Sequence, residues 1–169
     1  MKWFAHVVIA GATAAVIAPP LVPAAIAGGT APDWMEGVAK ATGHPVKHRT
    51  VTHIFTHWVI ASVICYFIHP MALAFALGGL SHVILDALTI SGVPASPWSK
   101  QRLHLLGGRF RTGEPSEYIF AVAYAAICYA IGTMAFTQEF APFFYNWGEL
   151  YDTGVIDGAE WKANRFKFI

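Results

Sequence analysis

Three apolar stretches dominate this sequence, and each is long enough to cross a lipid bilayer as a helix. They cover residues 51–68, 71–90 and 119–136, and the last contains no charged residue. A helix of about 20 apolar residues spans a hydrocarbon core of about 30 Å. Because only 12% of the 169 residues are charged and 56% are hydrophobic, we expect lipid around much of the chain. We therefore predict an all-α fold, a polytopic membrane bundle of three to four transmembrane helices.

The N-terminal segment, residues 4–27, is also apolar, but three prolines interrupt it. Lys2 and the small residues of PAAIAGG resemble a secretory signal with its cleavage site. Pro19, Pro20 and Pro23 nevertheless break the hydrophobic run, because proline removes a helical hydrogen bond and clashes with the preceding turn. We predict a proline-broken first segment, which is either one kinked span or a re-entrant hairpin.

Basic residues gather in two of the predicted loops. If the first segment spans, residues 28–50 and 91–118 lie on one side of the membrane. These loops contain Lys40, Lys47, Arg49, Lys100, Arg102, Arg109 and Arg111. The opposite side would contain Lys2, Lys162, Arg165 and Lys167. The positive-inside rule then places the two loops in the cytoplasm. The basic residues form no continuous face, so we expect no nucleic-acid partner.

Aromatic residues are dense in the C-terminal part, as in FAPFFYNW and RFKFI. Tryptophan and tyrosine rings favour the headgroup region of a bilayer. We therefore predict two parts, a transmembrane domain over residues 1–136 and an aromatic-rich interfacial tail over residues 137–169. The tail is expected to anchor the chain on the bilayer or to contact a protein partner.

Two ionisable residues, His82 and Asp86, interrupt the apolar stretch 71–90. An ionisable group inside a membrane helix costs about 2.5–3.5 kcal/mol, so such groups usually face a cavity, a partner or a metal. Because they are four residues apart, they lie on one face of a helix. Their nitrogen and oxygen atoms suit a divalent metal, with Zn²⁺ first and Mn²⁺ or Fe²⁺ as alternatives. A hydrogen-bonded pair that ties two helices together is the other interpretation.

Further candidates fall at the same predicted membrane face. Asp33 follows the first apolar segment, at 4–27, His53 lies at the entrance to the second, at 51–68, and Glu117 lies at the entrance to the last, at 119–136. Together with His82 and Asp86, they would supply ligands for one or two metals and leave positions open for water and substrate. Arg49 is suited to an anionic group such as phosphate, because its planar guanidinium offers paired donors.

Several motifs occur in a recognisable order: FAHVVIAG, PDWME, HRTVTH, GGLSHVILDALTISGVP and TGEPSEY. This order resembles the YdjM-like family of membrane-bound, metal-dependent hydrolases over residues 6 to 120. The resemblance implies a multi-pass protein of the bacterial inner membrane with a hydrolytic metal centre. The positions that match the family motifs are His6, Asp33, His48, Arg49, Thr52, His53, Ser81, His82, Asp86, Thr89 and Glu117.

One position departs from the family pattern. The family usually has Pro-Asp-x-Asp, whereas this chain has Met35 at the second acidic position and Glu36 one residue later. Either Glu36 substitutes for that ligand or one ligand is missing. The motif order is also distantly similar to zinc-dependent phospholipase C. In that case His6 should reach the cluster, which requires a hairpin at Pro19; a straight first span would leave His6 on the opposite face.

Two functions are compatible with these residues. The first is a metal-dependent hydrolase of a phosphoester, for example a phospholipid headgroup, at the cytoplasmic face. In that mechanism Asp86 or Glu117 would hold or deprotonate a metal-bound water, and Arg49 would stabilise developing charge. The alternative is a membrane assembly or scaffold protein, in which the metal or the polar cluster fixes helix packing. A divalent-metal carrier ranks third, because only one helix shows a polar face.

Overall fold

The computed structural model describes residues 1–99 and 101–135, which form a mostly helical protein. The described helices are α1 (Trp3–Ile17), α2 (Val22–Ala41), α3 (Phe55–Tyr66), α4 (Pro70–Ala87) and α5 (Pro115–Ala135). Two short strands, β1 (Val93–Pro94) and β2 (Arg102–Leu103), pair antiparallel in the loop between α4 and α5. The predicted tail at 137–169 lies outside the described residues, so the division into two parts stays a prediction.

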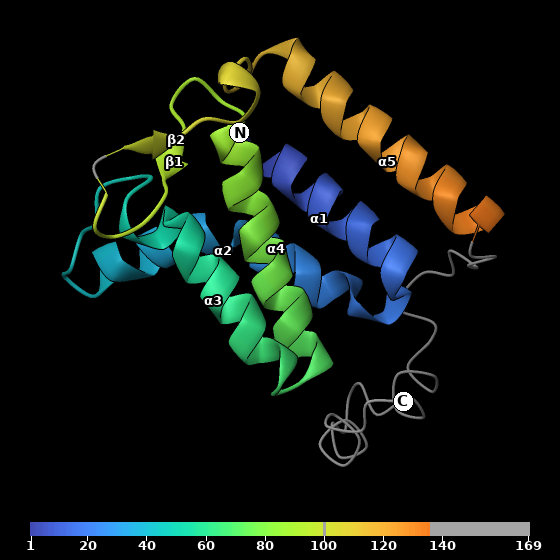
Figure 1. Ribbon diagram of the computed structural model, residues 1–169, viewed down its shortest axis with the longest axis horizontal. Coiled ribbons are helices and arrows are strands. Elements are labelled where there is room, and N and C mark those ends of the chain that lie inside the picture. The colour runs from blue at the N-terminus through green and yellow to red at the C-terminus, as the bar shows by residue number, and fades with distance from the viewer. Residues whose placement is uncertain (100, 136–169) are drawn as a thin grey trace.

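Helices α1 and α2 form a hairpin, which is the second of the two forms predicted for the first segment. Ala18 leaves the helical conformation, with φ −156° and ψ 88°, and residues 19–21 make a single 3₁₀ turn. The second helix then packs back against α1 (Figure 1). The predicted end of this segment at residue 27 is wrong, because α2 continues to Ala41 through a stretch expected to be a loop.

Close packing explains why this stretch is helical despite its glycines and Pro32. Helix α2 packs along α4, and a Cβ on Gly28 would collide with the backbone of Phe75. Likewise, a Cβ on Gly78 would collide with the carbonyl oxygen of Ala25. Small residues allow two backbones to approach closely, as in membrane helix pairs. Tertiary packing therefore stabilises a helix that local propensity disfavours.

The predicted helix over residues 51–68 is shorter than expected. Helix α3 has 12 residues, which corresponds to about 18 Å. Residues 51–53 form a 3₁₀ turn instead, and Thr52 within it donates a hydrogen bond to the side chain of Glu36. At the other end, the chain leaves the helix before Pro70, which begins α4. The tight antiparallel hairpin predicted for these two helices is present, since α3 packs against α4.

Two of the described helices are long and apolar enough to cross a membrane, by length and composition. They are Pro70–Ala87 and Pro115–Met134, whereas α1 and α3 are apolar but shorter. The predicted count of three to four spans therefore stays a prediction.

The two hairpins bring the polar loops and the chain start to one end of the bundle. The start of α1 and the end of α4 lie there beside the middle of α2, which contributes Gly29 and Asp33, and α5 begins nearby and runs along α1 (Figure 1). Lys2 lies at this end, where its backbone N–H donates to the carboxylate of Glu117. The prediction that Lys2 lies on the opposite side from the loops is therefore wrong, because α2 returns the chain to the end where α1 started.

Candidate metal centre

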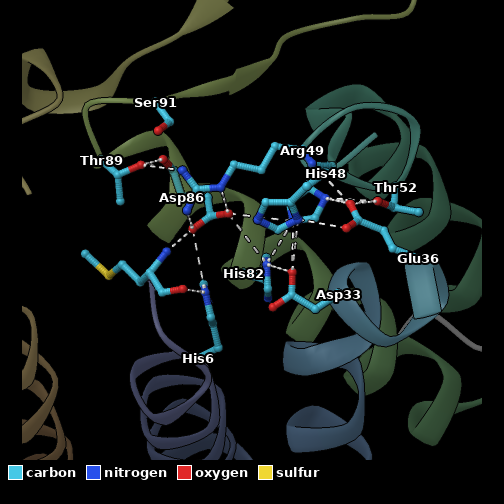
Figure 2. Close-up of polar contacts among 12 residues, drawn as sticks. His6, Asp33, Glu36, His48, Arg49, Thr52, His82, Asp86, Thr89 and Ser91 are labelled. Atoms are coloured by element: carbon cyan, nitrogen blue, oxygen red, sulfur yellow. Dashed lines mark hydrogen bonds and ion pairs between the residues drawn. The ribbon is translucent and has the colours of Figure 1, made fainter. Parts of the chain in front are cut away.

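Two histidines and two aspartates place metal-binding atoms close together at the polar end of the bundle, where Figure 2 labels Asp33, His82 and Asp86. The Nε2 atoms of His53 and His82 are 3.2 Å apart. Asp33 Oδ1 lies 3.4 Å from the first and 3.7 Å from the second. Asp86 Oδ2 lies 3.6 Å and 3.7 Å from the same two nitrogens. The structure thus brings together four of the residues predicted as ligands, from α2, α4 and the turn before α3.

In each imidazole, the contact made by Nδ1 shows whether Nε2, which faces the centre, carries a lone pair. His82 Nδ1 is 2.7 Å from the carbonyl oxygen of Gly29, which can only accept, so Nδ1 carries the hydrogen. His53 Nδ1 is 3.2 Å from Glu36 Oε1 and 2.9 Å from the hydroxyl of Thr52. That hydroxyl donates its own hydrogen to Glu36, so it accepts from His53. In the neutral rings both Nε2 atoms are therefore acceptors that face each other, an arrangement that a cation between them would satisfy.

A third observation comes from Asp33. Its Oδ1 is buried, and it has no hydrogen-bond partner among the described residues. Burial opposes ionisation of this carboxyl, but the contact with His53 and the charges of the neighbouring histidines outweigh it and lower the pKa of Asp33 below its ordinary value. A buried oxygen without a partner costs roughly 1–3 kcal/mol or more when it is charged. This atom is therefore a ready ligand for a cation.

The distances suit zinc or a similar metal. Ligand atoms bound at about 2.0–2.2 Å lie about 3.3–3.6 Å apart at tetrahedral angles. The distances among Asp33, His53 and His82, which form one possible metal-binding group, run from 3.2 to 3.7 Å, and Asp86 lies 3.6 Å and 3.7 Å from the two imidazole nitrogens. Two nitrogen and two carboxylate donors also match the ligand preferences of Zn²⁺, Mn²⁺ and Fe²⁺. The residues present therefore fit the predicted metal.

Glu36 supports these ligands from behind, a role that the sequence analysis did not find. Its side chain accepts from Thr52 at 2.9 Å and from the backbone N–H of Arg49 at 3.1 Å, and it contacts His48 Nδ1 at 2.7 Å and His53 Nδ1 at 3.2 Å. A carboxylate behind a ligating histidine fixes its ring and tautomer. The signal in the sequence is spacing, because Glu36 follows Asp33 by three residues and shares its helical face. Met35, between them, is 40% exposed.

His6 reaches the centre because of the α1–α2 hairpin. Its ring stacks on that of His82, with centroids 3.6 Å apart and planes 11° apart. Its Nε2 lies 3.6 Å from Asp86 Oδ1 and 3.3 Å from the carbonyl oxygen of Met1. His6, His82 and Asp86 form a second group whose atoms could hold a metal, beside the group of Asp33, His53 and His82. The predicted metal ligand His6 is thus adjacent to the other four.

Arg49 lies against Asp86 with its planar guanidinium. Its Nε is 2.9 Å from Oδ2 and its Nη2 is 3.0 Å from Oδ1 of that carboxylate, and Nη1 donates to Thr89 at 3.0 Å. The backbone of Arg49 is left-handed, with φ 57°, a conformation that costs roughly 1–2 kcal/mol outside glycine. Its N–H donates to Glu36. The motif HRTVTH therefore forms a constrained loop that directs this side chain inward.

Glu117 lies apart from the four ligand atoms. It is fully buried, and its two oxygens accept from the backbone N–H groups of Lys2 and Gly113, the second at 2.7 Å. It belongs to none of the possible metal-binding groups in the described part of the chain. The arrangement ties the chain start and the loop before α5 together. It gives no geometric support to the predicted ligand role of Glu117.

The family comparison agrees with the motifs in the sequence. The model of the family described as YdjM inner membrane protein matches residues 1–144. Comparisons with curated proteins and with solved structures give no significant match. Every residue of the candidate metal centre lies within the matched range. The chain therefore belongs to the YdjM family of inner membrane proteins.

Proposed function

We propose that this protein is a membrane-embedded, metal-dependent hydrolase that acts on a phosphoester. Asp33, His53, His82 and Asp86 would hold the metal, with zinc first and manganese or iron as alternatives. The observation that carries the proposal is the pair of Nε2 atoms 3.2 Å apart, each left with a lone pair by its Nδ1 contact. A bound divalent metal would supply Lewis-acid activation of a phosphoryl oxygen and of a water ligand.

The surrounding residues favour an anionic substrate. The guanidinium of Arg49 offers the paired donors that match carboxylate and phosphate oxygens. In the structure these donors contact Asp86, so a substrate phosphate would share or replace this contact. Of the two residues predicted to handle a water proton, Asp86 is the better placed, because it borders both imidazoles. Glu117 instead accepts two backbone hydrogen bonds.

Charge at the polar end supports a cytoplasmic orientation. Lys2 joins this end, together with basic residues of the two loops, Lys47, Arg49, Arg102, Arg109 and Arg111. The positive-inside rule then favours a multi-pass chain with its site at the cytoplasmic face of the inner membrane. A phospholipid headgroup or another phosphoester could reach the site from that interface.

Metal analysis of purified protein tests the proposal. We expect wild-type protein, purified in detergent without chelators, to retain close to one equivalent of a transition metal by elemental mass spectrometry. His82→Ala should lose it, because the substitution removes one of the two facing nitrogens. His57→Ala is the matched control, since His57 is an exposed histidine of α3. Wild-type protein that contains no metal, and binds none on addition of Zn²⁺, would refute the proposal.

The scaffold alternative has one specific observation in its favour. Asp86 joins three parts of the chain, through ion pairs with Arg49 and with the amino group of Met1 and through contacts with His6. Asp86→Asn separates the two functions, because the amide keeps the shape but removes the charge. A catalytic site predicts a folded variant without phosphoester hydrolysis. A purely structural cluster predicts a large loss of thermal stability or of assembly, and no phosphoester hydrolysis by either the variant or the wild-type protein.

A further inference from the structure

A second feature of the bundle lies directly beneath the metal centre. Residues of α1, α2, α4 and the turn at 19–21 line an apolar groove with a volume of about 140 Å³. Five of its thirteen lining residues are alanines, including Ala14 and Ala74, so these side chains leave space that larger ones would fill. Ile17 and Leu77, at 72% and 44% exposed, lie along it and face the surroundings of the bundle.

The groove ends close to the site on all three helices. Ala10, Ala25 and Gly78 belong to its lining. Each of them is four residues from a residue of the centre, respectively His6, Gly29 and His82. Four helical residues correspond to about 6 Å. One end of the groove therefore lies one helical turn below the stacked imidazoles.

The lining offers no unsatisfied polar group to a ligand. It contains two hydroxyl groups, and both are satisfied by protein atoms. Thr13 donates to the carbonyl oxygen of Ile9 at 2.8 Å and lies 2.8 Å from the hydroxyl of Tyr124. Ser81 donates to the carbonyl oxygen of Gly78 at 2.7 Å. An apolar cavity of this kind excludes water and accepts hydrocarbon.

Its dimensions suit a chain more than a headgroup. The lining runs along α4 from Pro70 to Ser81, which is about 17 Å of helix. An acyl chain that follows this length would lie only partly inside the volume of about 140 Å³, with the rest of the chain along the open side of the groove. Because α4 is also a candidate membrane span, lipid chains are the hydrocarbon that surrounds it.

We infer that the groove binds an acyl chain of a phospholipid substrate, whose phosphate lies at the metal centre beside Arg49. This inference rests on the proposed function and narrows its substrate to lipids. The groove would hold the chain between α1 and α4, while the headgroup extends one helical turn further to the ligands. A water-soluble phosphoester would lack this contact and would bind through the polar end alone.

Photolabelling tests the inference in nanodiscs of phosphatidylcholine that contain phosphatidic acid with a diazirine on its acyl chain. After illumination, peptide mass spectrometry locates the labels. In the wild-type protein, we expect more labels on the groove residues of α1 and α4 than on the exposed face of α5. Ala14→Phe should reduce groove labelling roughly tenfold, the ratio produced by about 1.4 kcal/mol of steric cost. Ala15→Phe, one position along and outside the lining, is the matched control.

The same variants separate this inference from the proposed function. Ala14→Phe should slow hydrolysis of phosphatidic acid and leave metal content and hydrolysis of a soluble aryl phosphoester unchanged. Leu73→Trp, a second substitution in the lining, should act in the same way if Ala14→Phe fails to fold. His82→Ala should lose the metal yet keep groove labelling. Labels spread equally over α4 and α5, or groove labelling that neither substitution reduces, would overturn the inference even if the protein binds zinc.

Discussion

The role of Glu36 gives the sharpest prediction, because its carboxylate contacts the outer nitrogen of His53. Its carboxylate contacts His48, Arg49, Thr52 and His53 at 2.7–3.2 Å. In Glu36→Gln the amide keeps the size but replaces one oxygen with a donor. The ring of His53 then loses the charge that fixes its Nδ1 hydrogen. Loss of such a supporting contact typically weakens metal binding 10–100-fold, or about 1.4–2.7 kcal/mol.

Competition with a chromophoric zinc chelator measures this change in purified protein. Glu114→Gln is the control, since Glu114 is half-exposed and forms a long ion pair of 4.0 Å with Arg111. Thermal unfolding of the metal-free proteins separates a change in affinity from a change in folding. If Glu36→Gln binds zinc as tightly as wild-type protein while His53→Ala loses it, Glu36 does not orient the ligand, and the geometric argument for the site fails.

Three further predictions concern packing, the anion site and the chain start. Gly78→Ala should lower the free energy of unfolding, measured by thermal denaturation, by about 1–3 kcal/mol, because the added methyl group meets the backbone of α2. Gly37→Ala is the control, since a Cβ added there has no described atom within 4 Å apart from its chain neighbours and its own helix backbone. Arg49→Lys should retain metal but lower kcat/KM for a phosphoester at least about tenfold, since the paired donors are lost; an unchanged kcat/KM would remove Arg49 from the mechanism. Glu117→Gln should lose about 1–3 kcal/mol of stability with full metal content, because one backbone donor loses its acceptor. Metal loss at unchanged stability would instead restore Glu117 as a ligand.

Sequence reasoning groups four candidate ligands that lie close together in the structure, because their geometry is local or follows from topology. His82 and Asp86 share a helical face by spacing alone, and both side chains line the centre. Asp33 and His53 were placed at the same membrane face by counting helices, and the structure brings them within 3.4 Å of each other. The apolar stretches also predicted helices at α4 and α5, although their ends differ by several residues.

Other features depend on packing that a single sequence does not reveal. Residues 28–41 are helical because glycines let α2 approach α4 closely, not because their own propensity is high. The hairpin at Ala18 was one of two alternatives, and only the packing of α2 on α1 decides between them. Glu117 was grouped with the ligands from its position before α5. Its carboxylate instead satisfies backbone donors, a contact that topology cannot specify.

The shortness of α3 has a consequence for the membrane itself. A helix of 12 residues is about 12 Å shorter than a hydrocarbon core of about 30 Å. Where a hydrophobic segment is too short, the bilayer thins around it at a modest energetic cost per ångström. His53 lies directly before this helix. Hydrophobic mismatch at α3 would thus draw the lipid headgroups down towards the histidine pair, so that a phosphate meets the site without its lipid leaving the bilayer.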